Sequence, residues 1–349
     1  GLIRRGAVLM DEGRLVAVGP ADQVLAHPDS RKGRVHDAGG RVVLPGFVDA
    51  HTHPVFAEPR LRDFELRARG KSYQEIAAAG GGILSSVGAL RGATERDLTA
   101  LLRERAARFI ECGTTTIEAK SGYGLDKDSE LKSLRALKHL AAGGVLGVVP
   151  TFLGPHAVPP EYQGRGAEYA AFLVREVLPV VAAEKLAAYA DVFCERGYFG
   201  TAECSDFLEA ARKAGLGLRV HAEQLTRSGG AQLAARLRAC SADHLDHADD
   251  QDLAALKAAG TVACLVPGSN HFLGLGTMPP ARSILEAGVP LALATDFNPG
   301  TCPCWNMQEI LAIAVTRMKM TPEEALVSAT VNGAWAAGLG KTHGALVAG

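Results

Sequence analysis

The sequence predicts an α/β fold: a (β/α)8 TIM barrel with a small, incomplete β-sandwich domain. From residue 42 onward, short apolar runs rich in β-branched residues alternate with helical stretches. There are eight such runs, and strands that alternate with helices of about 10–15 residues form parallel βαβ units. The chain has 349 residues, which leaves room beyond the ~250 residues of a typical barrel for a small appendage.

Local signals place each of the barrel elements. The strands are expected at residues 47–51, 114–120, 145–153, 190–195, 216–223, 241–245, 261–267 and 291–296. One helix is expected to begin after the N-cap Thr94 and to end before Gly113, with acidic residues in its first turn. Further helices are expected at residues 128–142, 167–183, 201–214, 230–240, 251–259 and 282–287. The active site of such a barrel lies where the strands end.

The beginning of the chain follows a different pattern. Residues 7–10 and 15–18 are apolar runs separated by Asp11-Glu12-Gly13, which predicts a β-hairpin. The chain starts within a pattern at Gly1 and stops at Gly349 without a terminating element. We therefore expect a piece of a longer protein.

Composition narrows the function classes. The chain is 47% hydrophobic and 21% charged, with a net charge of −1 and scattered Lys and Arg residues. Nucleic acids and membrane surfaces both attract basic patches, so neither is an expected partner. No apolar run reaches the ~18–20 residues that cross a bilayer. Seven cysteines in a chain of this length do not form a disulfide scaffold, and we expect free thiols in a reducing cytoplasm.

Histidine and aspartate side chains fall at the ends of four expected strands. His51 and His53 lie two residues apart, so an extended chain points both to one side. His221, His244 and Asp296 end or follow three other strands. Imidazole and carboxylate groups suit borderline divalent metals, and a metal that holds water lowers its pKa to about 7. A serine hydrolase is disfavoured because the chain has no GxSxG motif.

The motif Pro45-Gly46-Phe47-Val48-Asp49-Ala50-His51-Thr52-His53 resembles the opening motif of the amidohydrolase superfamily, and Thr295-Asp296 resembles its strand-eight aspartate. Many members bridge two metals with a lysine from strand four, but here that strand ends in Phe193-Cys194-Glu195. Lys120 ends strand two, which is the wrong strand for a bridge. The resemblance therefore implies the single-metal branch, with Glu195 as a conceivable extra ligand.

Longer stretches resemble the imidazolonepropionase family within this superfamily. They cover residues 53–57, 70–76, 80–83, 120–124, 151–157, 221–225, 241–245 and 295–301, within a match from about residue 40 to about 335. The resemblance implies hydrolysis of the cyclic amide 4-imidazolone-5-propanoate to N-formimidoyl-L-glutamate in histidine degradation. It also implies a homodimer and a β-sandwich formed by residues 1–44, beside a barrel of residues 45–340, with return strands starting at residues 341–349.

The resemblance assigns roles residue by residue. One zinc or iron ion is held by His51, His53, His221 and Asp296. Asp296 also accepts a proton from the attacking water, and His244 stabilises the oxyanion and shuttles protons. The expected substrate-binding residues are Arg60 and Tyr123 for the carboxylate, His156 for the ring, and Gln224, Asn298, Gly300 and Thr301, with Tyr73 as a further candidate for the carboxylate.

Several alternatives remain open at this level. Some members have Glu where this chain has Gln224, so the general base could be Asp296, His244 or the neighbouring Glu223. Imidazole and carboxylate ligands suit both zinc and iron. Another single-metal amidohydrolase, such as a heterocyclic amine deaminase, would share the ligands but would not need a carboxylate clamp. A non-catalytic barrel that keeps a metal or binds an imidazole ligand is the rival from another class.

Overall fold

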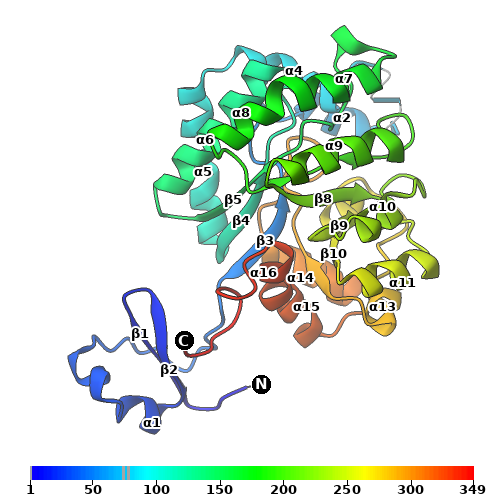
Figure 1. Cartoon of the computed structure of the whole chain (residues 1–349). Helices are drawn as coiled ribbons and strands as arrows, with labels where there is room; N and C mark the ends of the chain where they lie inside the picture. The colour runs from blue at the N-terminus through cyan, green and yellow to red at the C-terminus, as the bar shows by residue number, and fades with distance from the viewer. Residues whose placement is uncertain (1, 73–74, 77–78) are drawn as a thin grey trace.

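The computed structural model describes residues 2–72, 75–76 and 79–349 and contains a nearly closed parallel barrel (Figure 1). The sheet order is β11-β10-β9-β8-β6-β5-β4-β3, with β7 paired to β8. Backbone bonds between the ends of β3 and β11 join the two edges: Asp296 N–H donates to His51 O at 3.0 Å, and His53 N–H donates to Phe297 O at 2.8 Å. The barrel strands are β3 (Phe47–Thr52), β4 (Thr114–Lys120), β5 (Gly147–Phe152), β6 (Tyr189–Ala190), β7 (Phe193–Cys194), β8 (Gly217–Ala222), β9 (Ser241–His244), β10 (Val262–Leu265) and β11 (Leu291–Leu293).

All eight expected strand positions contain strand, which confirms the predicted barrel. The fourth expected strand differs in detail, because it divides into the short strands β6 and β7. Asp191 lies between them, and its backbone N–H donates to Phe152 O while its side chain turns towards the inside of the barrel. The strand is therefore interrupted where a carboxylate reaches the site.

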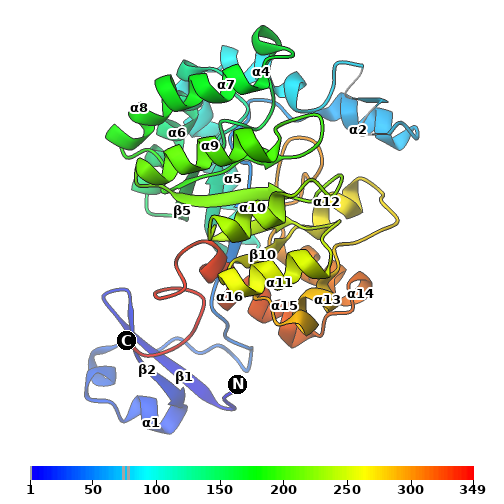
Figure 2. The ribbon, with the colours of Figure 1, turned by 45° about the vertical axis from the view of Figure 1, so that its right-hand side comes forward.

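Helices cover the outside of the barrel (Figures 1 and 2). The expected cap at Thr94 is present, since Thr94 and Asp97 form a capping box at the start of α5, and the helix ends before Gly113. The segment expected as one helix at 167–183 contains a π-helical turn, η3 (Leu173–Val177). The helices are α1 (Ala21–Leu25), α2 (Leu61–Ala68), α4 (Ile83–Gly92), α5 (Glu95–Glu111), α6 (Lys127–Ala142), α7 (Gly166–Phe172), α8 (Leu178–Ala183), α9 (Thr201–Lys213), α10 (Gly230–Arg236), α11 (Asp250–Ala259), α12 (Pro267–Phe272), α13 (Ala281–Ala287), α14 (Met307–Arg317), α15 (Pro322–Ala329) and α16 (Val331–Ala336), with short 3-10 turns η1 (Pro28–Lys32) and η2 (Pro160–Tyr162).

The last helix, α16, packs beside the first barrel strand. Ala334 and Ala337 form a small apolar cluster with Val48 and Val149, and the close approach of Gly333 to Val48 O leaves no room for a side chain there. Apolar packing of α16 thus covers the barrel at the start of β3.

The small N-terminal unit contains the predicted hairpin. β1 (Gly6–Asp11) pairs antiparallel with β2 (Arg14–Pro20) around the turn at Glu12 and Gly13. The C-terminal segment returns beside it (Figure 2), and Gly349 N–H donates to Leu15 O at 3.0 Å. Residues 341–349 form no strand in the structure, so a β-sandwich completed from the C-terminal side remains a proposal.

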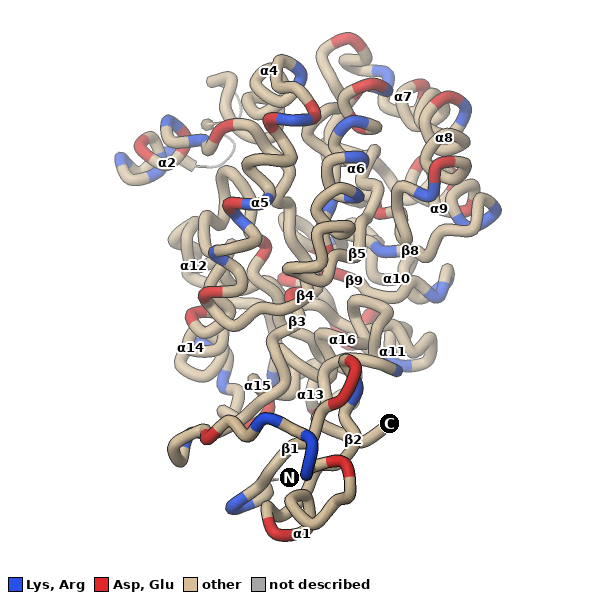
Figure 3. The backbone as a smooth tube through the Cα atoms, turned by 90° about the vertical axis from the view of Figure 1, so that its left-hand side faces the viewer, with Lys and Arg blue, Asp and Glu red and all other residues tan. Residues whose placement is uncertain are grey.

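The outer surface carries charges of both signs. Figure 3 shows Lys and Arg interspersed with Asp and Glu along the outer helices. Among the helices of the described residues, none is long and apolar enough to cross a membrane. Every cysteine of the described chain is a free thiol.

Candidate active site

Three histidines and one aspartate converge inside the carboxyl end of the barrel. His51 lies on β3, His53 directly follows it, and His221 lies on β8; all three are buried. Nε2 of His53 lies 3.2 Å from Nε2 of His51 and 3.3 Å from Nε2 of His221. Asp296, just beyond β11, places Oδ1 3.5 Å from Nε2 of both His51 and His53. The three imidazoles therefore converge on one small volume, and the Asp296 carboxylate lies beside two of them.

This donor set fits one divalent metal ion. Tetrahedral bonds of about 2.1 Å place ligand atoms about 3.4 Å apart, close to the observed separations of 3.2–3.5 Å. Burial lowers the pKa values of His51 and His53 well below the ordinary value, which favours the neutral imidazoles that bind metals. Burial also raises the pKa of Asp296 to about 6.

Two aspartates that the sequence analysis did not predict for the site face the far ring nitrogens of two histidines of the cluster. Asp243 Oδ2 lies 2.6 Å from Nδ1 of His51, and Asp191 Oδ2 lies 3.1 Å from Nδ1 of His221. An imidazole that donates its Nδ1 proton keeps a lone pair on Nε2. His53 Nε2 carries at most one proton, so at most one of its two close nitrogen contacts can be a well-aligned hydrogen bond donated by His53. A cation between those nitrogens stabilises the arrangement.

The positions of these aspartates explain why they were missed. Asp243 directly precedes His244 in the expected strand 241–245, and Asp191 lies in the expected strand 190–195. Neither residue ends an expected strand, whereas the expected metal ligands were the histidine and aspartate residues at strand ends. An acidic residue within a strand that is otherwise buried and apolar was the available signal, because a buried carboxylate requires a partner.

His244 lies at the edge of this cluster. Its ring centroid lies 5.3 Å from those of His51 and His221, and its Nδ1 is buried without a hydrogen-bond partner among the described residues. Burial lowers its pKa well below the ordinary value, so the ring is neutral. Its backbone has φ +76°, a left-handed conformation that is uncommon for residues with a side chain.

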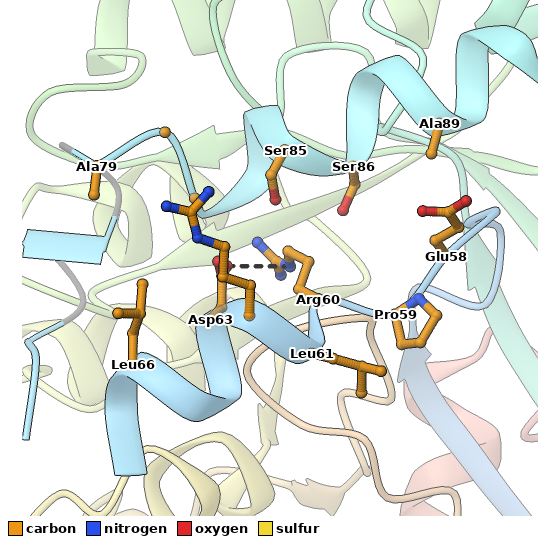
Figure 4. A pocket seen from close by; sticks show the side chains of 13 residues that line it. Glu58, Pro59, Arg60, Leu61, Asp63, Leu66, Ala79, Ser85, Ser86 and Ala89 are labelled. Carbon is orange, nitrogen blue, oxygen red and sulfur yellow. Dashed lines mark ion pairs between the residues drawn. The ribbon is translucent and has the colours of Figure 1, made fainter. Parts of the chain in front are cut away.

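Arg60 lies at the start of α2 and is buried beside the site. Its Nε and Nη1 atoms are buried without hydrogen-bond partners in the described structure, and Asp63 Oδ2 is 3.9 Å from Nε. Arg60 lines a cavity of about 430 Å³ between α2 and α4 (Figure 4). A buried guanidinium whose N–H groups lack hydrogen-bond acceptors is costly unless a further anion reaches it.

His156 and Tyr123 form the wall beside His53. The His156 ring stacks on His53 with centroids 5.2 Å apart, and Tyr123 lies 5.2 Å from His156. His156 Nδ1 lies 2.8 Å from Gly122 O and donates to it, which leaves Nε2 as an acceptor. Burial lowers the pKa of His156 to about 3, and repulsion from His221 adds to the effect. Tyr73, the further candidate for the carboxylate, lies outside the described residues.

The loop after Asp296 is held by the side chain of Asn298. Its Oδ1 accepts from the N–H groups of Gly300 and Thr301, at 2.9 and 2.7 Å, and its Nδ2 donates to Asp296 O and Thr301 Oγ1, both at 2.7 Å. A Cβ atom at Gly300 would overlap the guanidinium of Arg60. This loop therefore fixes Asp296 on one side and seats Arg60 on the other.

Sequence comparison identifies the family. The model of the Amidohydrolase family matches residues 42–349. An imidazolonepropionase from Symbiobacterium thermophilum is 48% identical over 353 residues, with 100% of this chain and 82% of the relative covered. The chain belongs to the imidazolonepropionase family. An imidazolonepropionase from Solibacter usitatus is 46% identical and covers 99% of this chain and 82% of its own length.

Solved structures share the fold of this imidazolonepropionase family member at low identity. 5-Methylcytosine deaminase from Klebsiella pneumoniae aligns with a TM-score of 0.71 and 16% identity, covering 97% of this chain and 85% of the deaminase. Guanine deaminase from C. acetobutylicum aligns with a TM-score of 0.65 and 16% identity, covering 99% and 84%. These structures support the barrel architecture alone. The substrate has to be inferred from the residues of the site.

Two glutamates considered for the site have structural partners in this family member. Glu223 accepts from the N–H groups of Ser228, Gly229 and Ala231, at 2.5, 3.0 and 3.0 Å, at the start of α10. Its φ of +55° turns its side chain there. Glu195 Oε2 accepts from the N–H groups of Leu225 and Thr226, at 2.8 and 3.1 Å. Both carboxylates therefore hold the loop after β8.

Replacing Glu223 by Gln is expected to weaken folding while leaving catalysis nearly intact. The amide keeps one acceptor but loses the charge at the amino end of α10, which costs about 1–2 kcal/mol of unfolding free energy. Denaturant unfolding and kcat, each with metal content, measure the two effects. Glu195→Gln is the matched control. A collapse of kcat with metal retained would identify Glu223 as the base.

Proposed function

We propose that the chain hydrolyses 4-imidazolone-5-propanoate to N-formimidoyl-L-glutamate. The observation that carries this proposal is the buried guanidinium of Arg60, whose Nε and Nη1 have no hydrogen-bond partner among the described residues and whose ion-pair partner Asp63 lies 3.9 Å away. A substrate carboxylate is the natural partner of such a group. Family membership supports the same reaction, whereas the deaminases with 16% identity share the fold alone.

We propose that His51, His53, His221 and Asp296 hold one zinc or iron ion. When bound, the ion supplies a water of lowered pKa and polarises the ring carbonyl. The support for this proposal is the convergence of the three imidazoles, the Asp296 carboxylate 3.5 Å from two of them, and the Asp191 and Asp243 carboxylates that face their far nitrogens.

Side chains of the protein then bind the substrate and transfer protons. Arg60 and Tyr123 bind the propionate, and the neutral His156 offers Nε2 to the ring. Asp296 accepts a proton as water oxygen bonds to the ring carbonyl carbon. His244 stabilises the developing oxyanion and returns a proton to the ring nitrogen as its bond to that carbon breaks. One water is consumed, and the open-chain product contains all atoms of both reactants.

Arg60→Met is expected to raise KM about ten- to a hundredfold. The reason is that a hydrogen bond to a charged partner contributes about 1.5–3 kcal/mol. Initial rates with the substrate and with an analogue that lacks the carboxylate measure the effect. Arg69→Met, at the exposed end of α2, is the control and should behave as wild type. Equal discrimination against the analogue by wild type and Arg60→Met would show that Arg60 does not contact the carboxylate.

Gln224→Ala is expected to raise KM and to leave the acid limb of the kcat–pH profile in place. Gln224 is partly buried in the loop after β8, and its neutral amide can donate to and accept from the ring but cannot take a proton. Gln224→Glu is expected to remain active. Steady-state kinetics across pH tests both variants. Loss of the acid limb in Gln224→Ala would contradict a role confined to binding.

We further propose that the enzyme acts in the cytoplasm and forms a homodimer. The free cysteines support a reducing compartment. Sedimentation of the purified chain tests the dimer.

An assay of guanine and cytosine beside imidazolonepropionate tests the deaminase alternative, since a higher kcat/KM for either amine would favour it.

A further inference from the structure

Directly beneath the histidine cluster lies a group of five buried charged residues, of which Lys120, Arg219 and Glu118 have no role in the proposed mechanism. Lys120 and Arg219 carry positive charge, and Glu118, Asp191 and Asp243 carry negative charge; all five side chains are fully buried. These residues come from β4, β8, β9 and the break between β6 and β7. Burying charges costs free energy even when they are paired. We therefore expect this group to contribute to function.

Lys120 is the residue that connects both orienting aspartates. Its Nζ lies 2.8 Å from Asp191 Oδ2 and 3.7 Å from Asp243 Oδ2. The same two oxygen atoms face Nδ1 of His221 and Nδ1 of His51, at 3.1 and 2.6 Å. One ammonium group thus stands behind two metal-ligand histidines that come from strands on different sides of the barrel.

Electrostatics favour a permanently charged lysine at this position. Burial alone lowers the pKa of Lys120, but the carboxylates of Asp191, Glu118 and Asp243 outweigh it and raise the pKa above the ordinary value. Glu118 Oε1 takes the third contact at 2.9 Å. The ammonium group of Lys120 thus donates a hydrogen bond to Glu118, forms a close ion pair with Asp191 and lies within ion-pair distance of Asp243.

We propose that Lys120 is a positioning residue that holds the Asp191 and Asp243 carboxylates against His221 and His51 and so sets the metal affinity of the site. This inference rests on the proposed metal centre. Without the ammonium group, the two carboxylates repel each other and turn away from the imidazoles. The Nε2 lone pairs then no longer point to one place, because the tautomer and tilt of each ring depend on its carboxylate.

A charge-balanced double variant separates positioning from simple charge compensation. The five groups sum to a charge of −1, from two positive and three negative side chains. Lys120→Met alone leaves −2, whereas Lys120→Met with Glu118→Gln restores −1. Glu118→Gln alone leaves Lys120 on both aspartates and is the matched control.

The experiment titrates each metal-free full-length variant with Co²⁺ against a competing chelator and records the visible spectrum of the Co²⁺ form. We expect the double variant to melt near the wild-type temperature yet to bind Co²⁺ about 10- to 100-fold more weakly, the usual effect of losing an outer-shell partner. Its spectrum should also change. Glu118→Gln should keep wild-type affinity and spectrum.

Wild-type Co²⁺ affinity and spectrum in the folded double variant would overturn the proposal, because Lys120 would then only balance charge. If the double variant fails to fold, the Co²⁺ affinities of Asp191→Asn and Asp243→Asn test the proposal instead, because each substitution weakens the contact to one histidine. Unchanged Co²⁺ affinity in both variants would overturn the proposal. Failure of wild type itself to bind one Co²⁺ per chain would instead contradict the proposed metal centre.

Discussion

Replacing His221 by Ala is expected to remove the bound metal and to reduce hydrolysis by at least about 10³-fold. His221 supplies one of the three converging imidazoles, and its Nε2 lies 3.3 Å from Nε2 of His53. A metal ion contributes several kcal/mol of transition-state stabilisation, and each 1.36 kcal/mol is a factor of ten in rate. Metal analysis of the purified variant, together with the ultraviolet loss of imidazolonepropionate, measures both effects.

The control for this variant is His271→Ala, an exposed histidine at the end of α12. It should keep one metal per chain and normal activity. Two tightly bound metals in the wild type, or full activity in a metal-free chain, would contradict the ligand assignment. Retention of metal by His221→Ala would show that the remaining donors suffice.

His244→Asn is expected to lower kcat by roughly 10²-fold or more and to leave metal occupancy near normal. Loss of an oxyanion donor or acid–base group has this scale. His244 is not among the converging donor atoms, and its buried, unpaired Nδ1 leaves it free to act on substrate. Asparagine also tolerates the left-handed backbone at this position, so the substitution tests the imidazole rather than the turn.

The measurement pairs single-turnover rates with metal analysis and thermal unfolding. A purely structural histidine would give a less stable protein with unchanged kcat in its folded fraction. Loss of metal together with kcat would instead place His244 among the ligands.

The pattern of the sequence was sufficient to predict the barrel and the residues at its rim. Alternation of apolar runs with capped helices is a local signal, because each strand and helix of a βαβ unit is specified by neighbours along the chain. The HxH spacing of His51 and His53 fixes both on one face of a strand, and the ends of parallel strands meet at one edge. These rules predict that His221, His244 and Asp296 lie at the same rim of the barrel.

Only the tertiary structure decided which polar groups serve the site and which serve the fold. Glu223 was a candidate base from its spacing, yet its backbone conformation directs the carboxylate to the N–H groups of α10. Asp191, Asp243 and Lys120 meet only because three strands distant in sequence are brought together across the barrel. Spacing within one strand predicts direction, but the partner of a buried charge is set by long-range packing, which a single sequence does not display.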